Sequence, residues 1–553
     1  MKKIVECVPN FSEGRDMTVI EKITDEIKKI PGVELLDVDP GKDTNRTVVT
    51  FAGDPDAAVE AAFQAIKKAA ELIDMSKQHG AHPRMGATDV CPFVPISGVT
   101  MADCVDIAKK LGQRVAEELH IPVYLYEEAA ASEERRSLAY IREGEYEALP
   151  EKLKKTEFKP DFGEAVFNPK SGATVIGARE FLIAYNINLN TRDVKIARKI
   201  ANRIREKGRT VTNKETGEKA QEPGTLKAVR AVGWYIPEYN MAQISVNLLN
   251  YKTTPLYQVF EECDKFAREF GIRVTGSELV GLIPLEAMLE SGRHFLRLQD
   301  GSTGVSEKEL VRIAVHSLGL AELGPFNSEH KIIEYKLRKK GRLAAMNLYD
   351  FADELASDSP APGGGSVAAL NGSLSAGLSA MVGNLTYGKK QYAEVKDVMV
   401  DVAEKAQKLK DFFTDAIDRD TEAFDKVMAA FGLPKGTPEE TGARAQAIQD
   451  ATKEATLVPF SVLEKTQETV ELALIMAEKG NQNSLSDSGV AGLTAAAAAE
   501  GALYNVMINL AGIDDEAFKA EIAQKAAQVN AKVQEIAAQV KKILYEKLKI
   551  AAL

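Results

Sequence analysis

Short strand-like stretches alternate with stretches of helical periodicity through the first half of the chain. The clearest helix follows Asp54 and Pro55, where apolar residues recur every three or four positions and form one buried stripe: Val59, Phe63, Ile66, Ala70 and Ile73. Strands are predicted near residues 4–8, 33–38, 48–51, 121–126, 181–189 and 242–248, and further helices near 17–30, 102–119, 191–207 and 255–270. This alternation predicts an α/β architecture.

Two of these strands place polar side chains on one face. Asn186 and Asn188 share a face of the first strand, and Gln243, Ser245 and Asn247 share a face of the second. Such a face lines a wet cleft or is turned to bulk solvent, and the pattern does not separate these two interpretations.

The pattern changes beyond residue 345, where alanine dominates and long helical periodicities run to the C-terminus. We therefore expect an α/β two-lobed N-terminal part, with lobes at 1–181 and 182–327, and an all-α helical-bundle domain at 346–553. Residues 328–345, which include a basic run from Lys336 to Arg342, are predicted to be the linker.

Composition narrows the class of protein. A chain of 553 residues with 45% hydrophobic residues exceeds a single core, so two or more domains are expected. The net charge of -11 argues against general nucleic-acid binding. Four scattered cysteines without zinc spacing favour reduced thiols and no metal site, and the absence of a long apolar run favours a soluble cytoplasmic protein without a membrane span.

Candidate chemistry concentrates in the loop from His79 to Asp89, which holds two of the six histidines. His82 suits proton transfer, and Arg84 suits an anion. A structural turn whose histidines only bond to backbone explains the same residues. A second loop, 161–172, carries Phe162 and Phe167; it suits a flat aromatic ligand or a surface crossover equally.

The helical half holds two further candidates. Gly363, Gly364 and Gly365 precede a helix of small residues, where backbone N–H groups can hold an anion. Asp420 lies on the same helical stripe as Phe413, Ile417 and Phe424, so burial is expected to raise its pKa and suit it to general-acid work. A buried structural carboxylate is the competing interpretation. The acidic residues Asp411, Asp415, Asp418 and Glu422 are interpreted as a solvated face.

These motifs together resemble a known family. The first half resembles glutamate formiminotransferase in four segments: Val8–Gly14 (VPNFSEG), Asn45–Val48 (NRTV), His82–Gly86 (HPRMG) and Gly233–Tyr235 (GWY). The second half resembles formimidoyltetrahydrofolate cyclodeaminase in four more: Ala361–Val367 (APGGGSV), Thr386–Gly388 (TYG), Gly480–Asn481 (GN) and Ser486–Asp487 (SD). Their order is that of the bifunctional formiminotransferase-cyclodeaminase family.

The resemblance implies two successive reactions on tetrahydrofolate. A formimino group moves from N-formimino-L-glutamate to N5, with His82 as general base, and the helical domain then closes N10 onto the formimino carbon and releases ammonia, with Asp420 as its catalytic aspartate. The product is 5,10-methenyltetrahydrofolate, and the pathway is histidine degradation. The implied substrate contacts are Asn10, Asp39, Arg84, Gly163, Phe167 and Gly172 in the first site, and Gly364, Asn481 and Asp487 in the second.

The resemblance also implies small-molecule substrates, a polyglutamylated tetrahydrofolate as co-substrate, no metal, and a homo-oligomer, specifically an octamer. Two alternatives remain open from the sequence. One is the same fold acting on formiminoglycine or a formyl donor, and the other is a non-catalytic folate-binding protein.

Overall fold

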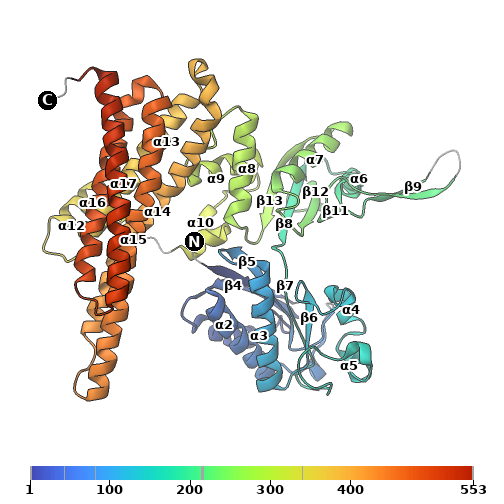
Figure 1. Cartoon of the computed structure of the whole chain (residues 1–553). Coiled ribbons are helices and arrows are strands. Elements are labelled where there is room, and N and C mark those ends of the chain that lie inside the picture. Colours follow the sequence, from blue (N-terminus) through green and yellow to red (C-terminus); the bar gives the residue numbers. More distant parts are fainter. Residues whose placement is uncertain (1–2, 43, 81–82, 213–216, 339–340, 551–553) are drawn as a thin grey trace. The chain divides into compact units, whose positions relative to one another are not determined.

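The computed structural model describes residues 3–550 except 43, 81–82, 213–216 and 339–340. Its contacts divide the chain into two compact units, one of Met1–Ser291 with Val315–Arg338 and the other of Gly292–Ala314 with Lys339–Leu553. The first unit is α/β and the second is mostly helical, in agreement with the fold class expected from the sequence (Figure 1).

A seven-stranded mixed sheet forms the N-terminal part of the first unit. Its order is β1-β4-β2-β5-β7-β6, with β3 paired to β4, and β7 runs parallel to both β5 and β6. The strands are β1 (Ile4–Cys7), β2 (Asn10–Phe11), β3 (Val33–Gly41), β4 (Arg46–Gly53), β5 (Thr88–Ser97), β6 (Val123–Glu127) and β7 (Thr174–Ala178).

Helices cover the two faces of this sheet unequally. The main core joins one face to α1 (Met17–Lys28), α2 (Pro55–Leu72) and α3 (Met101–Leu119). The predicted stripe of α2 packs there, with Phe63 and Ile66 at most 2% exposed. On the other face, α4 (Leu138–Arg142) and α5 (Glu145–Lys152) pack only over β5, β6 and β7.

Burial of a carboxyl on that second face predicts a pH-dependent stability. Glu6 is 3% exposed, and burial raises its pKa from 4.5 to about 7, although the charge of Arg179 opposes the rise. Between these two pH values only the unfolded chain releases the proton, so the free energy of unfolding falls as pH rises, by roughly 3 kcal/mol in total. Below the pKa of the unfolded chain none of this free energy is lost, and above the pKa of the folded protein the loss is complete.

Glu6→Gln removes this titration. Urea unfolding at acid and at mildly alkaline pH should show wild-type stability falling relative to the variant, whereas Glu34→Gln on the exposed side of β3 should follow wild type. Equal pH dependence in wild type and Glu6→Gln contradicts the assignment.

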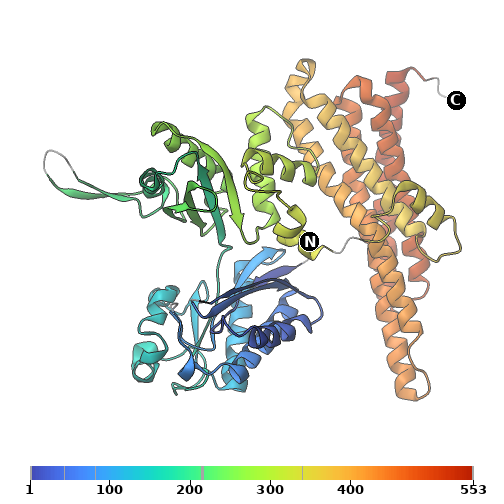
Figure 2. The ribbon, with the colours of Figure 1, turned by 180° about the vertical axis from the view of Figure 1, so that it is seen from behind.

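A second, antiparallel sheet of order β11-β12-β8-β13 follows in the same unit. Its elements are β8 (Ile183–Leu189), α6 (Val194–Ile204), β11 (Val229–Ile236), β12 (Met241–Leu248), α7 (Leu256–Glu269) and β13 (Val274–Val280). The hairpin of β9 (Arg209–Thr212) and β10 (Lys219–Glu222) extends away from this sheet (Figures 1 and 2).

The polar face of β8 and β12 is largely buried. Gln243 pairs with Asn188 across the strands and donates from Nε2 to its Oδ1 at 2.8 Å, and Asn188 Nδ2 donates to Glu322 Oε2 at 2.7 Å. Gln243 and Asn188 are at most 1% exposed, and Asn247 at the other end is exposed. These amides satisfy one another, so most of the face turns neither to a wet cleft nor to bulk solvent.

The stretch expected as a linker contains ordered structure. Two short helices lie within it, α10 (Ser328–Lys331) and α11 (Ile333–Leu337), and the helices α8 (Leu285–Leu298) and α9 (Glu307–Ser317) precede it. Ile332 and Ile333 are fully buried, a core contribution that the sequence pattern did not reveal. The domain boundaries drawn from the sequence remain a prediction.

Residues 292–314 pack with the helical unit. Asn384 Nδ2 donates to Gly304 O at 2.8 Å, Thr303 Oγ1 donates to Glu404 Oε1 at 2.5 Å, and a side chain at Gly304 would lie 2.2 Å from the Ala403 Cβ. This loop therefore contributes to the stability of the helical unit.

Long helices form the rest of that unit: α12 (Leu348–Leu355), α13 (Gly364–Tyr387), α14 (Lys396–Phe431), α15 (Pro438–Lys479), α16 (Leu485–Leu510) and α17 (Glu516–Leu548). The helix α15 begins with a reciprocal capping box between Thr437 and Glu440. Short 3-10 turns lie at Met75–Lys77, Glu134–Arg136, Thr156–Phe158, Lys390–Val395 and Gln482–Ser484.

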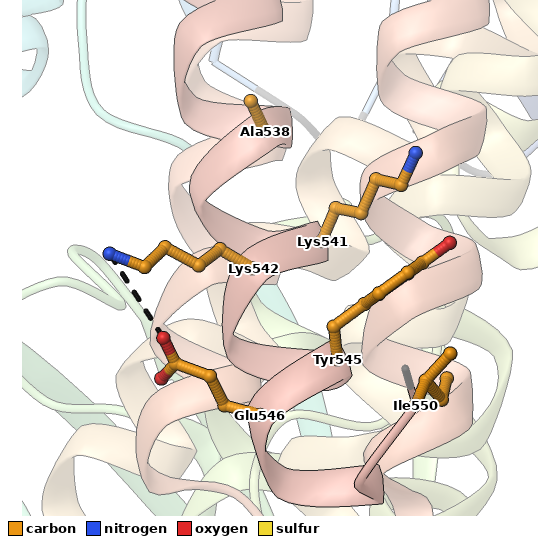
Figure 3. A pocket seen from close by; sticks show the side chains of 6 residues that line it. All are labelled: Ala538, Lys541, Lys542, Tyr545, Glu546 and Ile550. Carbon is orange, nitrogen blue, oxygen red and sulfur yellow. Dashed lines mark ion pairs between the residues drawn. The ribbon is translucent and has the colours of Figure 1, made fainter. Parts of the chain in front are cut away.

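Three observations concern classes of function. Among the described residues, no helix has the length and apolar character needed to cross a bilayer. Across the same part of the chain, no cluster of three or more His, Cys, Asp or Glu side chains could hold a metal ion. A hollow of about 440 Å³ on α17 is lined by Ala538, Lys541, Lys542, Tyr545, Glu546 and Ile550, none of them a candidate site residue (Figure 3).

Candidate functional site

The loop that carries the histidines is held between three other segments of the first unit. His82 lies outside the described residues. On the near side of the loop, Asn45 Nδ2 donates to His79 O at 3.0 Å, and Gln78 Nε2 donates to Asn45 O at 2.8 Å. Asn45 adopts a positive φ of 48°, a conformation that asparagine tolerates. It also accepts from Gly14 N at 3.0 Å, which joins two of the motifs.

The far side of the loop meets the end of the second candidate loop. Gly86 and Gly172 form an isolated β-bridge, and Ser12 Oγ donates to Gly86 O at 2.7 Å. Gly172 has a φ of 68°, and a Cβ there would lie 2.1 Å from Met85 O, so glycine is required. The structure thus brings together segments that are far apart in the sequence.

Arg84 is already occupied by carboxylates of its own chain. Its Nη1 donates to Glu145 Oε2 at 2.9 Å, its Nη2 donates to Glu147 Oε1 at 2.7 Å, and its Nε donates to Gln78 Oε1 at 2.9 Å. Burial alone lowers the pKa of Arg84, but Glu147 and Glu145 outweigh it and raise that pKa. An anionic substrate would have to displace these partners, so the contacts suit Arg84 to fixing the loop.

A second buried ion pair anchors the other end of the loop. Asp89 is fully buried, pairs with Arg142, and accepts from Met85 N at 3.0 Å. No local sequence signal pointed to the partners of the loop in α4 and α5, because Arg142, Glu145 and Glu147 lie more than 50 residues later.

Asn10 and Asp39 lie in one row across the first sheet. Asp39 is opposite Val48, and Val48 is opposite Asn10, so all three side chains share a face. Strands lie about 4.8 Å apart, which puts Asn10 and Asp39 roughly 10 Å apart on that face. This face is opposite to α1, α2 and α3, since the neighbouring residues Thr47 and Val49 point to the other side.

The two remaining candidates of the second loop line a pocket. Gly163 and Phe167 lie in a hollow of about 820 Å³, whose other walls include Gln113, Glu117 and His120 at the end of α3. Phe167 also packs against Tyr146, with ring centroids 5.5 Å apart. Gly163 and Phe167 therefore line a hollow large enough for a flat ligand, whereas Gly172 meets the histidine loop.

In the helical unit, Asp420 lies against the glycine run at the start of α13. A Cβ at Gly365 would be 2.2 Å from Asp420 Oδ1, so glycine here makes room for the carboxyl. Burial raises the pKa of Asp420, as the sequence predicted, and hydrogen bonds from Ser366 partly offset the rise. Of the stripe expected around Asp420, Phe413 and Ile417 are buried, but Phe424 is 40% exposed, and the start of α13 also packs against the carboxyl.

Asn505 in α16 joins this group. A Cβ at Gly364 would lie 3.3 Å from Asn505 Nδ2, and that nitrogen donates to Gly501 O at 2.8 Å. The sequence shows that Asn505 is a polar residue in an apolar helix and so requires hydrogen-bond partners. Helical periodicity alone could not place Asn505 beside Gly364.

The other two residues expected near Gly364 lie elsewhere in the unit. The backbone N–H of Asn481 donates to Thr386 Oγ1 at 2.9 Å, and its side chain caps the following turn by accepting from Asn483 N at 3.1 Å. Thr386 follows Gly364 by 22 residues of α13, about 33 Å along the helix. Asp487, in the first turn of α16, is at that end as well. Within a single chain, Asn481 and Asp487 therefore lie far from Gly364 and Asp420.

Asp418 corrects the interpretation of the acidic face. Its carboxylate accepts from Leu343 N at 2.8 Å and from Ala344 N at 2.9 Å, so it fixes the segment before α12. Asp415 and Glu422 are exposed, as expected.

Comparison with known proteins covers both units. The family model described as "Formiminotransferase domain, N-terminal subdomain" matches residues 4–179, "Formiminotransferase domain" matches 184–338, and "Formiminotransferase-cyclodeaminase" matches 347–528. A formimidoyltransferase-cyclodeaminase of Gallus gallus is 46% identical over 96% of this chain and 96% of its own length.

Two shorter relatives match parts of the chain. A glutamate formimidoyltransferase of Streptococcus pyogenes serotype M1 is 44% identical over 54% of this chain and 95% of its own. A methenyltetrahydrofolate cyclohydrolase of Methylorubrum extorquens is 50% identical over 31% of this chain and 82% of its own.

Proposed function

Because the chain belongs to the formimidoyltransferase-cyclodeaminase family, we propose that it carries out two successive reactions on one folate. The first transfers the formimino group of N-formimino-L-glutamate to N5 of tetrahydrofolate. The second cyclises the 5-formimino product to 5,10-methenyltetrahydrofolate and releases ammonia, a sequence that belongs to histidine degradation. The observation that carries this proposal is similarity across both halves of the chain, at 46% identity.

The first reaction is assigned to the loop from His79 to Asp89 and to the face of the first sheet that is opposite to α1, α2 and α3. N5 forms a bond to the formimino carbon, the bond from that carbon to the glutamate nitrogen breaks, and a proton passes from N5 to the departing nitrogen. We assign the proton transfer to His82. The ion pairs of Arg84 and Asp89 support this by fixing both ends of its loop, and Asn10 and Asp39 offer polar groups on the adjacent sheet face.

The second reaction is assigned to Asp420 and the start of α13. N10 bonds to the formimino carbon and gives up its proton to the former formimino nitrogen. That nitrogen then takes a second proton from an acid and leaves as ammonia. A carboxyl with a raised pKa is suited to donate that proton. Asn505 lies beside Gly364, where its amide can hydrogen-bond the departing nitrogen.

We propose that the folate carries a polyglutamate tail and that the loop from Gly163 to Gly172 contacts the folate. A tail held by the protein would keep the 5-formimino intermediate close to the second site, which raises its effective concentration. Neither bond change requires a metal.

We further propose a cytoplasmic homo-oligomer, an octamer. Large apolar side chains are exposed on two neighbouring helices of the helical unit, among them Leu374 and Leu385 of α13 and Leu493 and Ile508 of α16, each at least 47% exposed. Apolar surface of this kind supports association between copies. Light scattering of the eluting protein measures the assembly mass, and a monomer would refute this part of the proposal.

The proposed function is tested with tetrahydrofolate and a panel of donors: formiminoglutamate, formiminoglycine and formylglutamate. Methenyl absorbance and free ammonia are followed together. We expect both to rise in equal amounts with formiminoglutamate. No turnover with any donor, in folded protein, would leave only a non-catalytic folate-binding role.

The cyclohydrolase relative favours one further activity, hydrolysis of the methenyl product. The same assay reports it, since methenyl absorbance would then decay faster with enzyme than without.

A further inference from the structure

Arg46 lies on the face of the first sheet opposite to α1, α2 and α3, beside the row of Asn10 and Asp39. It is two residues before Val48 on β4, so its side chain shares the face of Val48 and Asn10. Its Nη2 donates to the carboxamide oxygen of Asn10, which is 5% exposed. Asn10 thus fixes the position of the guanidinium.

The guanidinium of Arg46 is incompletely paired. Within the described parts of the chain, its Nε is buried without a hydrogen-bond partner and its guanidinium forms no ion pair. Burial lowers the pKa of Arg46 and the nearby charge of Asp89 opposes this, and an arginine remains cationic in either case. Arg46 as a whole is only partly buried, but its buried Nε–H is an unused donor, which is costly unless a ligand completes its contacts.

Arg46 differs from Arg84 in how the N–H donors of its guanidinium are paired. Arg84 has two carboxylates and an amide around it, so its donors are used within the chain. Among the described residues, the guanidinium of Arg46 has Asn10 as its one hydrogen-bond partner, although Asp39 lies on the adjacent strand, on the face that the proposed function assigns to transfer. The planar fork of an arginine matches a carboxylate group in geometry and charge.

We propose that Arg46, rather than Arg84, binds a carboxylate group of the substrates in the transferase site. This inference rests on the proposed function. The carboxylate comes from one of two sources, the glutamate part of the formimino donor or the glutamate tail of the folate. The shared chemistry is an arginine–carboxylate pair oriented by Asn10.

The test is the kinetics of Arg46→Gln, with KM measured for each co-substrate while the other saturates. Losing a charged hydrogen bond should raise the KM for one co-substrate by about 10- to 100-fold. Cyclisation of supplied 5-formiminotetrahydrofolate should be unchanged. Arg46→Lys should recover part of the loss, because it keeps the charge without the fork.

Arg136→Gln serves as the control, since Arg136 forms an ion pair with Glu128 and is 41% exposed. Its KM values should equal those of wild type. A rise confined to the formimino donor identifies the donor carboxylate. A rise confined to the folate, larger for polyglutamate than monoglutamate, identifies the tail.

Inhibition of the wild-type enzyme needs no variant and covers the case in which Arg46→Gln fails to fold. Glutarate should compete with the donor, or pteroylpolyglutamate with the folate, more strongly than the matching amides. Unchanged KM in folded Arg46→Gln, or equal inhibition by acid and amide, overturns the role of Arg46. Failure of the proposed function itself is distinguishable, because wild type would then show no transfer.

Discussion

Asp420→Asn is expected to slow cyclisation by about 10²- to 10⁴-fold while formimino transfer keeps its wild-type rate. Asparagine preserves the size of the side chain against Gly365, where space is limited, but it cannot donate the proton that departing ammonia requires. The measurement is cyclisation of supplied 5-formiminotetrahydrofolate, followed by methenyl absorbance. Transfer is followed separately by release of glutamate.

The pH profile gives an independent readout of the same carboxyl. Burial raises the pKa of Asp420, so its protonated form persists to higher pH than that of an exposed aspartate. Donation by Asp420 should therefore weaken as pH rises through this raised pKa, and cyclisation should slow on the alkaline side. The residual activity of Asp420→Asn should lack that decline.

Asp425→Asn is the matched control, because Asp425 lies on the exposed side of the same helix. It should leave both reactions unchanged. The assignment of Asp420 is wrong if Asp420→Asn cyclises normally, or if it loses both activities while retaining its fold.

His82→Ala is expected to have the opposite effect. Transfer should fall by about 10²- to 10⁴-fold because the proton on N5 loses its acceptor, and cyclisation of supplied 5-formiminotetrahydrofolate should continue at its wild-type rate. Glutamate release measures the first and methenyl absorbance measures the second.

His79→Ala is the control for this loop. The described contact of His79 with Asn45 is made by its backbone oxygen, and its side chain is exposed, so transfer should be retained. Equal loss of transfer in both variants would show that the loop conformation, and not the His82 imidazole, limits the reaction.

Local periodicity predicted the parts of the fold that depend on neighbours in the sequence. The α2 stripe of Phe63 and Ile66 is buried as expected, and the helical spacing of Phe413 and Ile417 distinguishes Asp420 from the other acidic residues of α14. Both inferences need only the pitch of one helix and the side that it buries.

Long-range pairing explains what could not be predicted. Arg84 looked available for an anion because Glu145 and Glu147 lie about 60 residues later, and nothing in the local pattern links them. Asp418 looked solvated for the same reason, since its partners at Leu343 and Ala344 precede it by about 75 residues. Predictions for polar side chains fail most often in this way, because one distant partner decides whether their hydrogen-bonding groups are already paired.

The most direct measurement of the two-site account joins the two variants in sequence. Asp420→Asn is incubated with tetrahydrofolate and formiminoglutamate, the protein is removed by filtration, and the filtrate is given to His82→Ala. The account predicts that the filtrate contains 5-formiminotetrahydrofolate and that His82→Ala converts it to the methenyl product with one equivalent of ammonia. If His82→Ala is folded but cannot convert the filtrate, the division of the two reactions between His82 and Asp420 is contradicted.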